Sequence, residues 1–250
     1  MQIKKLQSER SKQIQDTFQL TSLCARVLAA KELTDEQITE LLKKPQLADP
    51  FSAKGMQEVA QRIYQAKQNK EQVMVCGDYD ADGICSTAIL VDALRRYGIQ
   101  AGFYIPNRFA EGYGLQKHTV QQAHEKGYRL LITVDNGVKA LDALQEAKNR
   151  GVDVIVTDHH SMDEEFPCLY LLHPVCMGEQ FETLSGAGVA LELSRALLGE
   201  VKEHVVLACV AAIADVMPLR KETRAIVQLG LQYLRQGVCQ PIQLLANDRY

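Results

Sequence analysis

Short apolar runs alternate with amphipathic stretches through the middle of the chain. The apolar runs have the length and aliphatic content of buried strands, at 73–76, 101–105, 129–134, 152–157 and 168–172. Apolar residues at helical spacing between the first four runs predict helices over 83–97, 115–126 and 139–150. Because strands and helices alternate, we predict an α/β fold with a doubly wound, mainly parallel sheet and helices on both faces.

Both ends of the chain show helical patterns. Near the N-terminus, Thr34 and Gln37 have the spacing of a capping box, and Pro45 is expected to end the helix that they open. A loop at 49–50 and a helix over 55–69 should follow. Beyond the last apolar run, helices are predicted over 186–198, 203–214 and 222–234. In the helix over 83–97, we expect one apolar stripe to point inward: Ile84, Thr87, Ala88, Val91 and Leu94.

Composition restricts the class of protein. No apolar run approaches the ~20 residues needed to cross a bilayer, and the first residues, MQIKKLQSERSKQ, lack the apolar segment of a secretory signal. The seven cysteines are scattered without a Cys-x-x-Cys pair, so we expect reduced core residues in a cytoplasmic protein. A formal net charge of −3 does not by itself favour a nucleic-acid binder.

Acidic side chains follow three of the predicted strands and one later apolar segment. The carboxyl ends of neighbouring strands in a doubly wound sheet meet at one edge, where such sheets bind ligands. We therefore expect six aspartates and two histidines to gather there: Asp78, Asp80, Asp82, Asp135, Asp158, His159, His160 and Asp215.

So many carboxylates repel one another and are costly to bury unless a cation lies among them. Carboxylates with some imidazole suit Mn²⁺ or Mg²⁺ better than a metal that prefers thiolates. The number of carboxylates exceeds what one divalent ion needs. We therefore predict two ions, ~3.5–4 Å apart and bridged by a shared aspartate. Each acidic turn taken alone is equally typical of a solvated surface turn.

The order of these motifs resembles a known family. GDYDADG, VDNG and TDHH, followed by IADVMPL, are similar to the motifs of the DHH phosphoesterase superfamily. Within it, PNRF running into EGYGL, together with LSGAGV and ETR, resembles the RecJ-like single-strand-specific 5′→3′ exonucleases. The resemblance extends from about residue 49 to residue 234.

The resemblance implies roles for individual residues. Five are implied metal ligands, with Asp135 bridging: Asp80, Asp82, Asp135, His159 and Asp215. Asp78 is either a further ligand or, like Asp158 and Asn136, a group that orients the ligands. His160 either binds metal or donates to the scissile phosphate. Four other residues are implied to contact substrate: Arg108, Gly186, Gly188 and Arg224.

The resemblance also implies a function. A water activated by two Mn²⁺ or Mg²⁺ ions would hydrolyse the 5′ end of single-stranded nucleic acid, with DNA expected, in repair and recombination. Partners would include single-strand-binding or recombination proteins. No association with a membrane is expected. The expected organisation is an N-terminal helical extension (1–55), a DHH catalytic domain (56–235) and the start of a linker (236–250) towards a second, DHH-associated domain beyond this sequence.

Three alternatives remain at this point. A DHH hydrolase for short oligonucleotides, cyclic dinucleotides or pyrophosphate would tend to have PDGDA-x-GS in the first motif, where this chain has GDYDADGICS. A non-catalytic DHH scaffold would lack some acidic residues, whereas all are present here. A generic dinucleotide binder would need Gly-x-Gly-x-x-Gly after the first strand, and that motif is absent. Digestion polarity, the choice between DNA and RNA, the physiological metal and the oligomeric state are left open.

Overall fold

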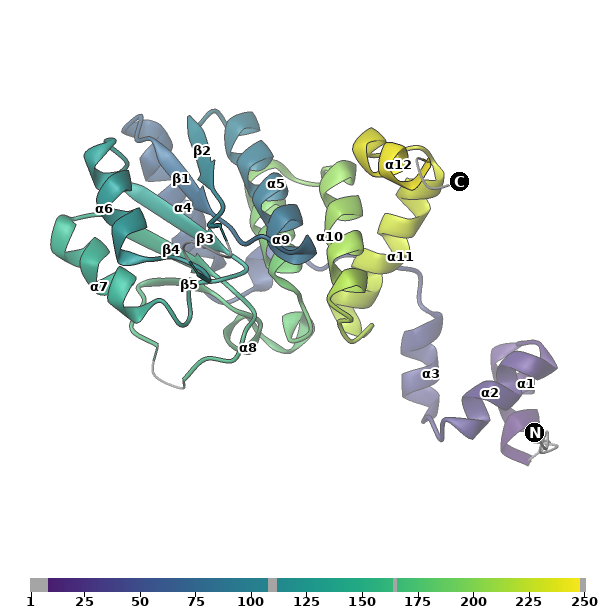
Figure 1. Cartoon of the computed structure of the whole chain (residues 1–250). Helices are drawn as coiled ribbons and strands as arrows, with labels where there is room; N and C mark the ends of the chain where they lie inside the picture. The colour runs from purple at the N-terminus through teal and green to yellow at the C-terminus, as the bar shows by residue number, and fades with distance from the viewer. Residues whose placement is uncertain (1–8, 108–111, 164–165, 248–250) are drawn as a thin grey trace. The chain divides into compact units, whose positions relative to one another are not determined.

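The computed structural model describes residues 9–107, 112–163 and 166–247 of the chain (Figure 1). The chain divides into two compact units, Met1–Lys44 and Pro45–Tyr250. No helix in the described ranges is both long enough and apolar enough to cross a bilayer.

From residue 9 onward, the N-terminal unit contains three short helices, α1 (Glu9–Phe18), α2 (Ser22–Ala30) and α3 (Asp35–Leu42). One buried apolar residue from each helix forms its small core: Ile14, Ala25 and Ile38. The predicted capping box is confirmed. The Thr34 hydroxyl accepts from the Gln37 N–H at 3.3 Å, and the Gln37 side chain accepts from the Thr34 N–H at 3.0 Å.

The second unit contains a five-stranded, all-parallel sheet with strand order β2-β1-β3-β4-β5. The strands are β1 (Val73–Cys76), β2 (Ala101–Tyr104), β3 (Leu130–Val134), β4 (Asp153–Thr157) and β5 (Tyr170–Leu172). From β1 the chain moves outward to β2 and then returns to β3 on the other side of β1. The order therefore reverses between β1 and β3, the position where open α/β sheets bind ligands.

Helices cover both faces of this sheet, which confirms the predicted doubly wound fold (Figure 1). On one face, α6 (Lys117–Glu125) and α7 (Leu141–Arg150) pack on a core that includes Met74 and Leu131. On the other face, α4 (Met56–Gln68), α5 (Ala81–Arg96) and α9 (Gly186–Leu198) pack on a core that includes Val75 and Ile132. Neighbouring residues of one strand thus point to opposite cores, as the pleat requires.

Helices also make up the end of the described chain. α10 (Lys202–Ala214) packs on α5 and α9, α11 (Lys221–Arg235) packs on α10, and α12 (Gln240–Asn247) follows. Four elements were not expected: α12, α8 (Pro174–Met177) and the 3₁₀ helices η1 (Pro50–Ser52) and η2 (Glu179–Phe181). The loop predicted at 49–50 is in fact the start of η1, because the Asp49 side chain accepts from the Phe51 N–H at 3.0 Å and Pro50 suits a first helical position.

The prediction that Ile84 and Ala88 point inward is wrong. Ile84 is 51% exposed, and Ala88 is also exposed. α5 lies between the sheet, α9 and α10, so it is buried around most of its circumference rather than along one stripe. Its narrow solvent-facing strip is the one that contains Ile84 and Ala88.

Candidate metal centre

The turn after β1 places three aspartates at the carboxyl edge of the sheet. α5 begins at Ala81, two residues before the predicted start, because the Asp80 side chain caps it by accepting from the Gly83 N–H at 2.9 Å. Asp82 therefore lies in the first helical turn, whereas Asp78 lies in the preceding turn. A Cβ on Gly83 would be 2.7 Å from the Asp78 carbonyl carbon, so glycine is needed for the helix to begin this close to Asp78.

The first turn of α9 holds the Asp82 carboxylate. Its two oxygens accept from the Gly186 N–H at 2.7 Å and the Ala187 N–H at 2.8 Å. The Gly188 N–H donates to the Ser185 hydroxyl at 3.2 Å. The amides of Gly186 and Gly188 therefore donate within the protein, and the predicted contact of these two residues with substrate stays a prediction. The amides of Gly186 and Ala187 orient Asp82.

Asp135, directly after β3, has an unusual backbone. Its φ of 60° lies in the left-handed region, which non-glycine residues enter at a cost of about 1 kcal/mol or more. Its N–H donates to the Thr157 carbonyl at 3.0 Å, and its own carbonyl accepts from the Tyr113 hydroxyl at 3.0 Å. A Cβ on Gly186 would be 2.6 Å from the Asp135 Cβ, so only glycine lets α9 approach Asp135 this closely.

Asn136 joins the ends of two strands. Its side-chain amide donates to the Cys76 carbonyl at 3.0 Å and to the Val134 carbonyl at 2.9 Å, and its carbonyl oxygen accepts from the Leu115 N–H at 3.2 Å. The residue is fully buried. Asn136 thus fixes the positions of the acidic turns after β1 and β3 relative to each other.

Asp158, directly after β4, uses both carboxylate oxygens within the protein. One accepts from the Val138 N–H at 2.9 Å. The other accepts from the backbone N–H groups of both following histidines and lies 2.8 Å from Nδ1 of His160. Burial acts to raise the pKa of Asp158, but the hydrogen bonds from His160 and Val138 outweigh it and the pKa is lowered. Asp158 is therefore a charged group that orients the two histidines.

Sequence reasoning missed the support that His173 gives to this turn. The ring accepts from the Val175 N–H at Nδ1, so Nε2 bears the proton and donates to the His160 carbonyl at 2.8 Å. Burial lowers the pKa of His173, which keeps the ring neutral. The Tyr113 hydroxyl, 3.3 Å from Nδ1 of His160, is a second contact that the sequence analysis did not predict.

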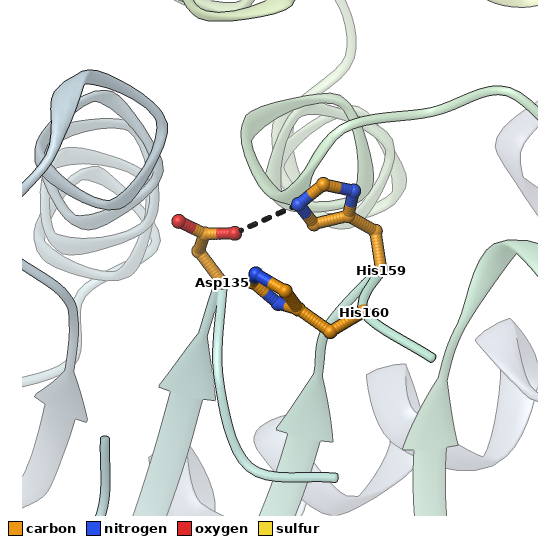
Figure 2. A group of neighbouring side chains, drawn as sticks. All are labelled: Asp135, His159 and His160. Atoms are coloured by element: carbon orange, nitrogen blue, oxygen red, sulfur yellow. Dashed lines mark ion pairs between the residues drawn. The ribbon is translucent and has the colours of Figure 1, made fainter. Parts of the chain in front are cut away.

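The predicted ligands converge in three groups whose donor atoms all lie within 4.8 Å of one another. The groups are Asp78, Asp80 and Asp135; then Asp135, His159 and His160; then Asp82, His159 and Asp215. Figure 2 shows Asp135 and the two histidines approaching each other from adjacent strand ends. Nε2 of His159 is 3.1 Å from Asp135, 3.4 Å from Asp82 and 3.7 Å from Asp215. Asp135 and His159 each belong to two of the groups, and of these only the carboxylate of Asp135, with its two oxygens, can bridge two ions.

Two predicted substrate contacts are less well defined. Arg108 lies outside the described residues. Arg224 is half-buried in the first turn of α11, the helix that follows Asp215 along the chain, and its contact with substrate stays a prediction.

Electrostatics at this edge favour a cation. Burial, reinforced by the charges of Asp82 and Asp80, raises the pKa of Asp135 to about 7. Burial also raises the pKa of Asp82. Burial would lower the pKa of His159, but Asp135 and Asp82 outweigh it and the pKa is raised. The raised pKa values of all three groups indicate that this cluster favours a bound cation, whether a proton or a metal ion.

The donors fit hard divalent cations. Oδ1 of Asp135 is buried without a hydrogen bond, although His159 is close enough for an ion pair. A buried, charged oxygen in this position is the kind of group that a metal ion satisfies. Carboxylates with one or two imidazoles are a donor set for Mn²⁺ or Mg²⁺.

The chain is similar in sequence and fold to known proteins. A family model described as the DHH family, N-terminal domain, matches residues 72–217. The single-stranded-DNA-specific exonuclease RecJ of Bacillus subtilis is 38% identical over 258 residues, covering 99% of this chain and 33% of that protein. RecJ of Escherichia coli is 32% identical over 244 residues, covering 89% of this chain and 42% of that protein.

A solved structure has a similar fold. The crystal structure of RecJ from Thermus thermophilus in complex with Mn²⁺ superposes with a TM-score of 0.79 at 32% identity, covering 96% of this chain and 35% of that one. The chain thus spans between about a third and two fifths of the length of these relatives. Because the family model matches more than half of the 250 residues, the chain belongs to the DHH family.

Proposed function

We propose that this chain is the catalytic part of a two-metal phosphodiester hydrolase that removes nucleotides from the 5′ end of single-stranded DNA. The observation that supports this most strongly is the place of Asp135 in two groups of potential ligands at the switch point of the sheet. Two cations that share one carboxylate are typical of enzymes that hydrolyse phosphodiesters.

The proposed ions are Mn²⁺ or Mg²⁺, because the similar RecJ structures were determined with these metals. We assign the ligands as Asp78, Asp80, Asp82, Asp135, His159 and Asp215. When bound, the two ions would lower the pKa of a water molecule and stabilise negative charge at the phosphorus.

Residues around the ligands prepare the site for the substrate. Asp158 fixes the His160 ring, and the hydrogen bond between them raises the pKa of His160 to about 9. His160 is therefore protonated near neutral pH and can donate to a phosphate oxygen. Asp82 is held by α9 before any metal binds, which reduces the entropy lost on binding.

Single-stranded DNA is proposed as the substrate because relatives that align with most of this chain are named single-stranded-DNA-specific exonucleases. A role in DNA repair and recombination and partners that bind single strands or act in recombination belong to the same proposal. So does a division into an N-terminal extension, a catalytic domain and the start of a linker (236–250), in which the catalytic domain is taken to begin at Pro45, with the second compact unit, and not at the predicted residue 56. We further propose a cytoplasmic location, since all seven cysteines are free thiols.

The test is hydrolysis of a long 5′-phosphorylated single strand with Mn²⁺, using strands labelled at either end. Release of mononucleotides from the 5′ end is expected, and Asp135→Asn should reduce it to background. Asp16→Asn, which removes an exposed carboxylate from α1, is the matched control and should remain active.

Two other results would contradict the proposal. Faster hydrolysis of a dinucleotide than of the long strand would favour a hydrolase for small phosphoesters. Tight Mn²⁺ binding without hydrolysis of any of these substrates would favour a scaffold.

A further inference from the structure

A cavity of about 280 Å³ lies beside the metal centre, outside the groups of potential ligands. It is lined by residues 113–117, which lead into α6, and by residues 137 and 139–143, which lead into α7. Its volume is near the lower end of the range for small-molecule sites, ~300 Å³. It can therefore accommodate a group larger than a water molecule.

The cavity shares its walls with the metal centre. Tyr113 lines the cavity, and its hydroxyl donates to the Asp135 carbonyl at 3.0 Å. Leu115 also lines it, and its N–H donates to the side chain of Asn136 at 3.2 Å. A molecule bound at the metals and extending past Tyr113 would enter the cavity.

The sign of charge in the cavity is opposite to that of the metal centre. Lys117 and Lys139 line it from α6 and from the segment before α7. Both lysines are exposed. Neither ammonium group forms an ion pair or hydrogen bond with another described residue. At longer range, the charge of Lys117 helps to lower the pKa of Glu146. Asp142 is the one acidic residue of the lining, so the side chains contribute a net positive charge.

Backbone amides add to this positive potential. The residues that precede α6 and α7, Gln116 and Ala140, make no side-chain capping hydrogen bond. Both lie in the cavity lining. The first N–H groups of the two helices therefore lack a side-chain acceptor from the capping position.

We propose that this cavity binds the non-bridging oxygens of one phosphate of a nucleic-acid strand, next to the phosphodiester that is hydrolysed at the metal centre. This inference rests on the proposed function and adds a subsite to it. The two lysines neutralise the phosphate, and Tyr113 separates it from the carboxylates. The subsite would select a strand over an isolated phosphodiester.

The test compares two double variants with the same loss of charge. Lys117→Ala with Lys139→Ala removes the cavity lysines. Lys126→Ala with Lys148→Ala removes two exposed lysines from the C-terminal ends of the same helices, α6 and α7. Circular dichroism and thermal unfolding of all proteins establish that each variant is folded as the parent is.

Binding is measured by fluorescence anisotropy with a 3′-labelled oligo(dT) 12-mer in metal-free buffer at several KCl concentrations. Each phosphate contact to a single strand contributes about 0.7 to the slope of log K against log salt. Because the cavity is proposed to hold one phosphate, the slope of the cavity variant should be smaller in magnitude by about 0.7, and the slope of the control variant should not change. Equal losses in both variants, or no loss in either, would overturn the proposal.

Hydrolysis with Mn²⁺ separates this subsite from the catalytic machinery. For the 12-mer, the KM of the cavity variant should be at least tenfold higher than that of the parent. For thymidine 5′-(p-nitrophenyl phosphate), which is a single phosphodiester, the KM should be unchanged. An equal rise for both substrates would place the lysines at the metal centre and contradict the subsite. If the parent protein hydrolyses neither substrate, the proposed function fails, and the salt dependence of binding still decides whether the cavity is a phosphate site.

Discussion

Asp135 combines three properties that structural residues rarely share. It is buried, its backbone is left-handed, and its side chain belongs to two groups of potential ligands. Its N–H donates to the Thr157 carbonyl, and its carbonyl accepts from the Tyr113 hydroxyl. These two hydrogen bonds hold the strained backbone in place. Strain held in this way at a cluster of carboxylates indicates a functional position.

Metal binding at Asp135 should depend on pH near neutrality. A carboxyl whose pKa is raised to about 7 must lose its proton to bind a cation, so Mn²⁺ affinity should fall as pH decreases through 7 and level off above it. Per proton displaced, the decrease approaches about tenfold per pH unit. Calorimetric titration at pH 6, 7 and 8 measures this, and Asp135→Asn should bind more weakly with a flatter pH dependence. Affinity that is constant from pH 6 to 8 would show that Asp135 is ionised before metal binds.

His160 should contribute more to turnover than to metal affinity. Asp158 holds its ring and raises its pKa to about 9, the arrangement expected of a cationic donor to phosphate. His160→Ala should lower kcat by about 100-fold, the usual contribution of a positioned proton donor, and change the Kd for Mn²⁺ little. His118→Ala, at an exposed histidine of α6, is the control. A loss of Mn²⁺ binding as large as the loss of turnover would make His160 a metal ligand.

At the scale of elements, the start of α9 organises the centre. Its first amides orient Asp82, and its glycine at position 186 allows the helix to contact Asp135. α9 thus couples the turn after β1 to the turn after β3, although the helix itself supplies no potential ligand among those that converge.

Gly186→Ala should therefore damage the metal centre. The new Cβ would lie 2.6 Å from the Asp135 Cβ and 2.7 Å from its Oδ1, and overpacking of this kind costs about 1–3 kcal/mol. We expect weaker Mn²⁺ binding and a lower free energy of unfolding, measured by titration and urea denaturation. In Gly188→Ala of the same helix, the Cβ would instead meet the Leu184 side chain at 2.9 Å, so Mn²⁺ affinity should persist. Equal Mn²⁺ affinities in the two variants would contradict the role given to Gly186.

At the scale of the whole molecule, the sequence predicted the sheet and the converging acids because both depend on local patterns. Buried parallel strands are continuous apolar runs, and the edge at which they end is fixed by the fold class. Contacts between distant segments were not predictable from such patterns. The amides at 186 and 187 bind Asp82, and His173 supports His160, because the chain packs these segments together.

The division into two units predicts which truncations keep the metal centre. All eight converging acidic and histidine residues lie in the unit Pro45–Tyr250. That unit begins just before Ala48, whose N–H donates to the buried Glu222 carboxylate at 3.0 Å and whose carbonyl accepts from Arg195 at 2.8 Å. Removal of residues 1–44 keeps this contact, whereas removal of residues 1–55 leaves the Glu222 carboxylate without its backbone donor.

We therefore expect the protein lacking residues 1–44 to bind Mn²⁺ with nearly the parental Kd. At about 100 times that Kd, bound metal should stabilise it by about 2.7 kcal/mol. The protein lacking residues 1–55 should be less stable by about 1–3 kcal/mol or more, because a buried carboxylate has lost a hydrogen bond. Urea denaturation with and without Mn²⁺ measures both effects. Loss of Mn²⁺ binding in the shorter truncation would mean that the N-terminal unit contributes to the metal centre, and equal stability of the two truncations would place the start of the catalytic unit nearer to residue 55.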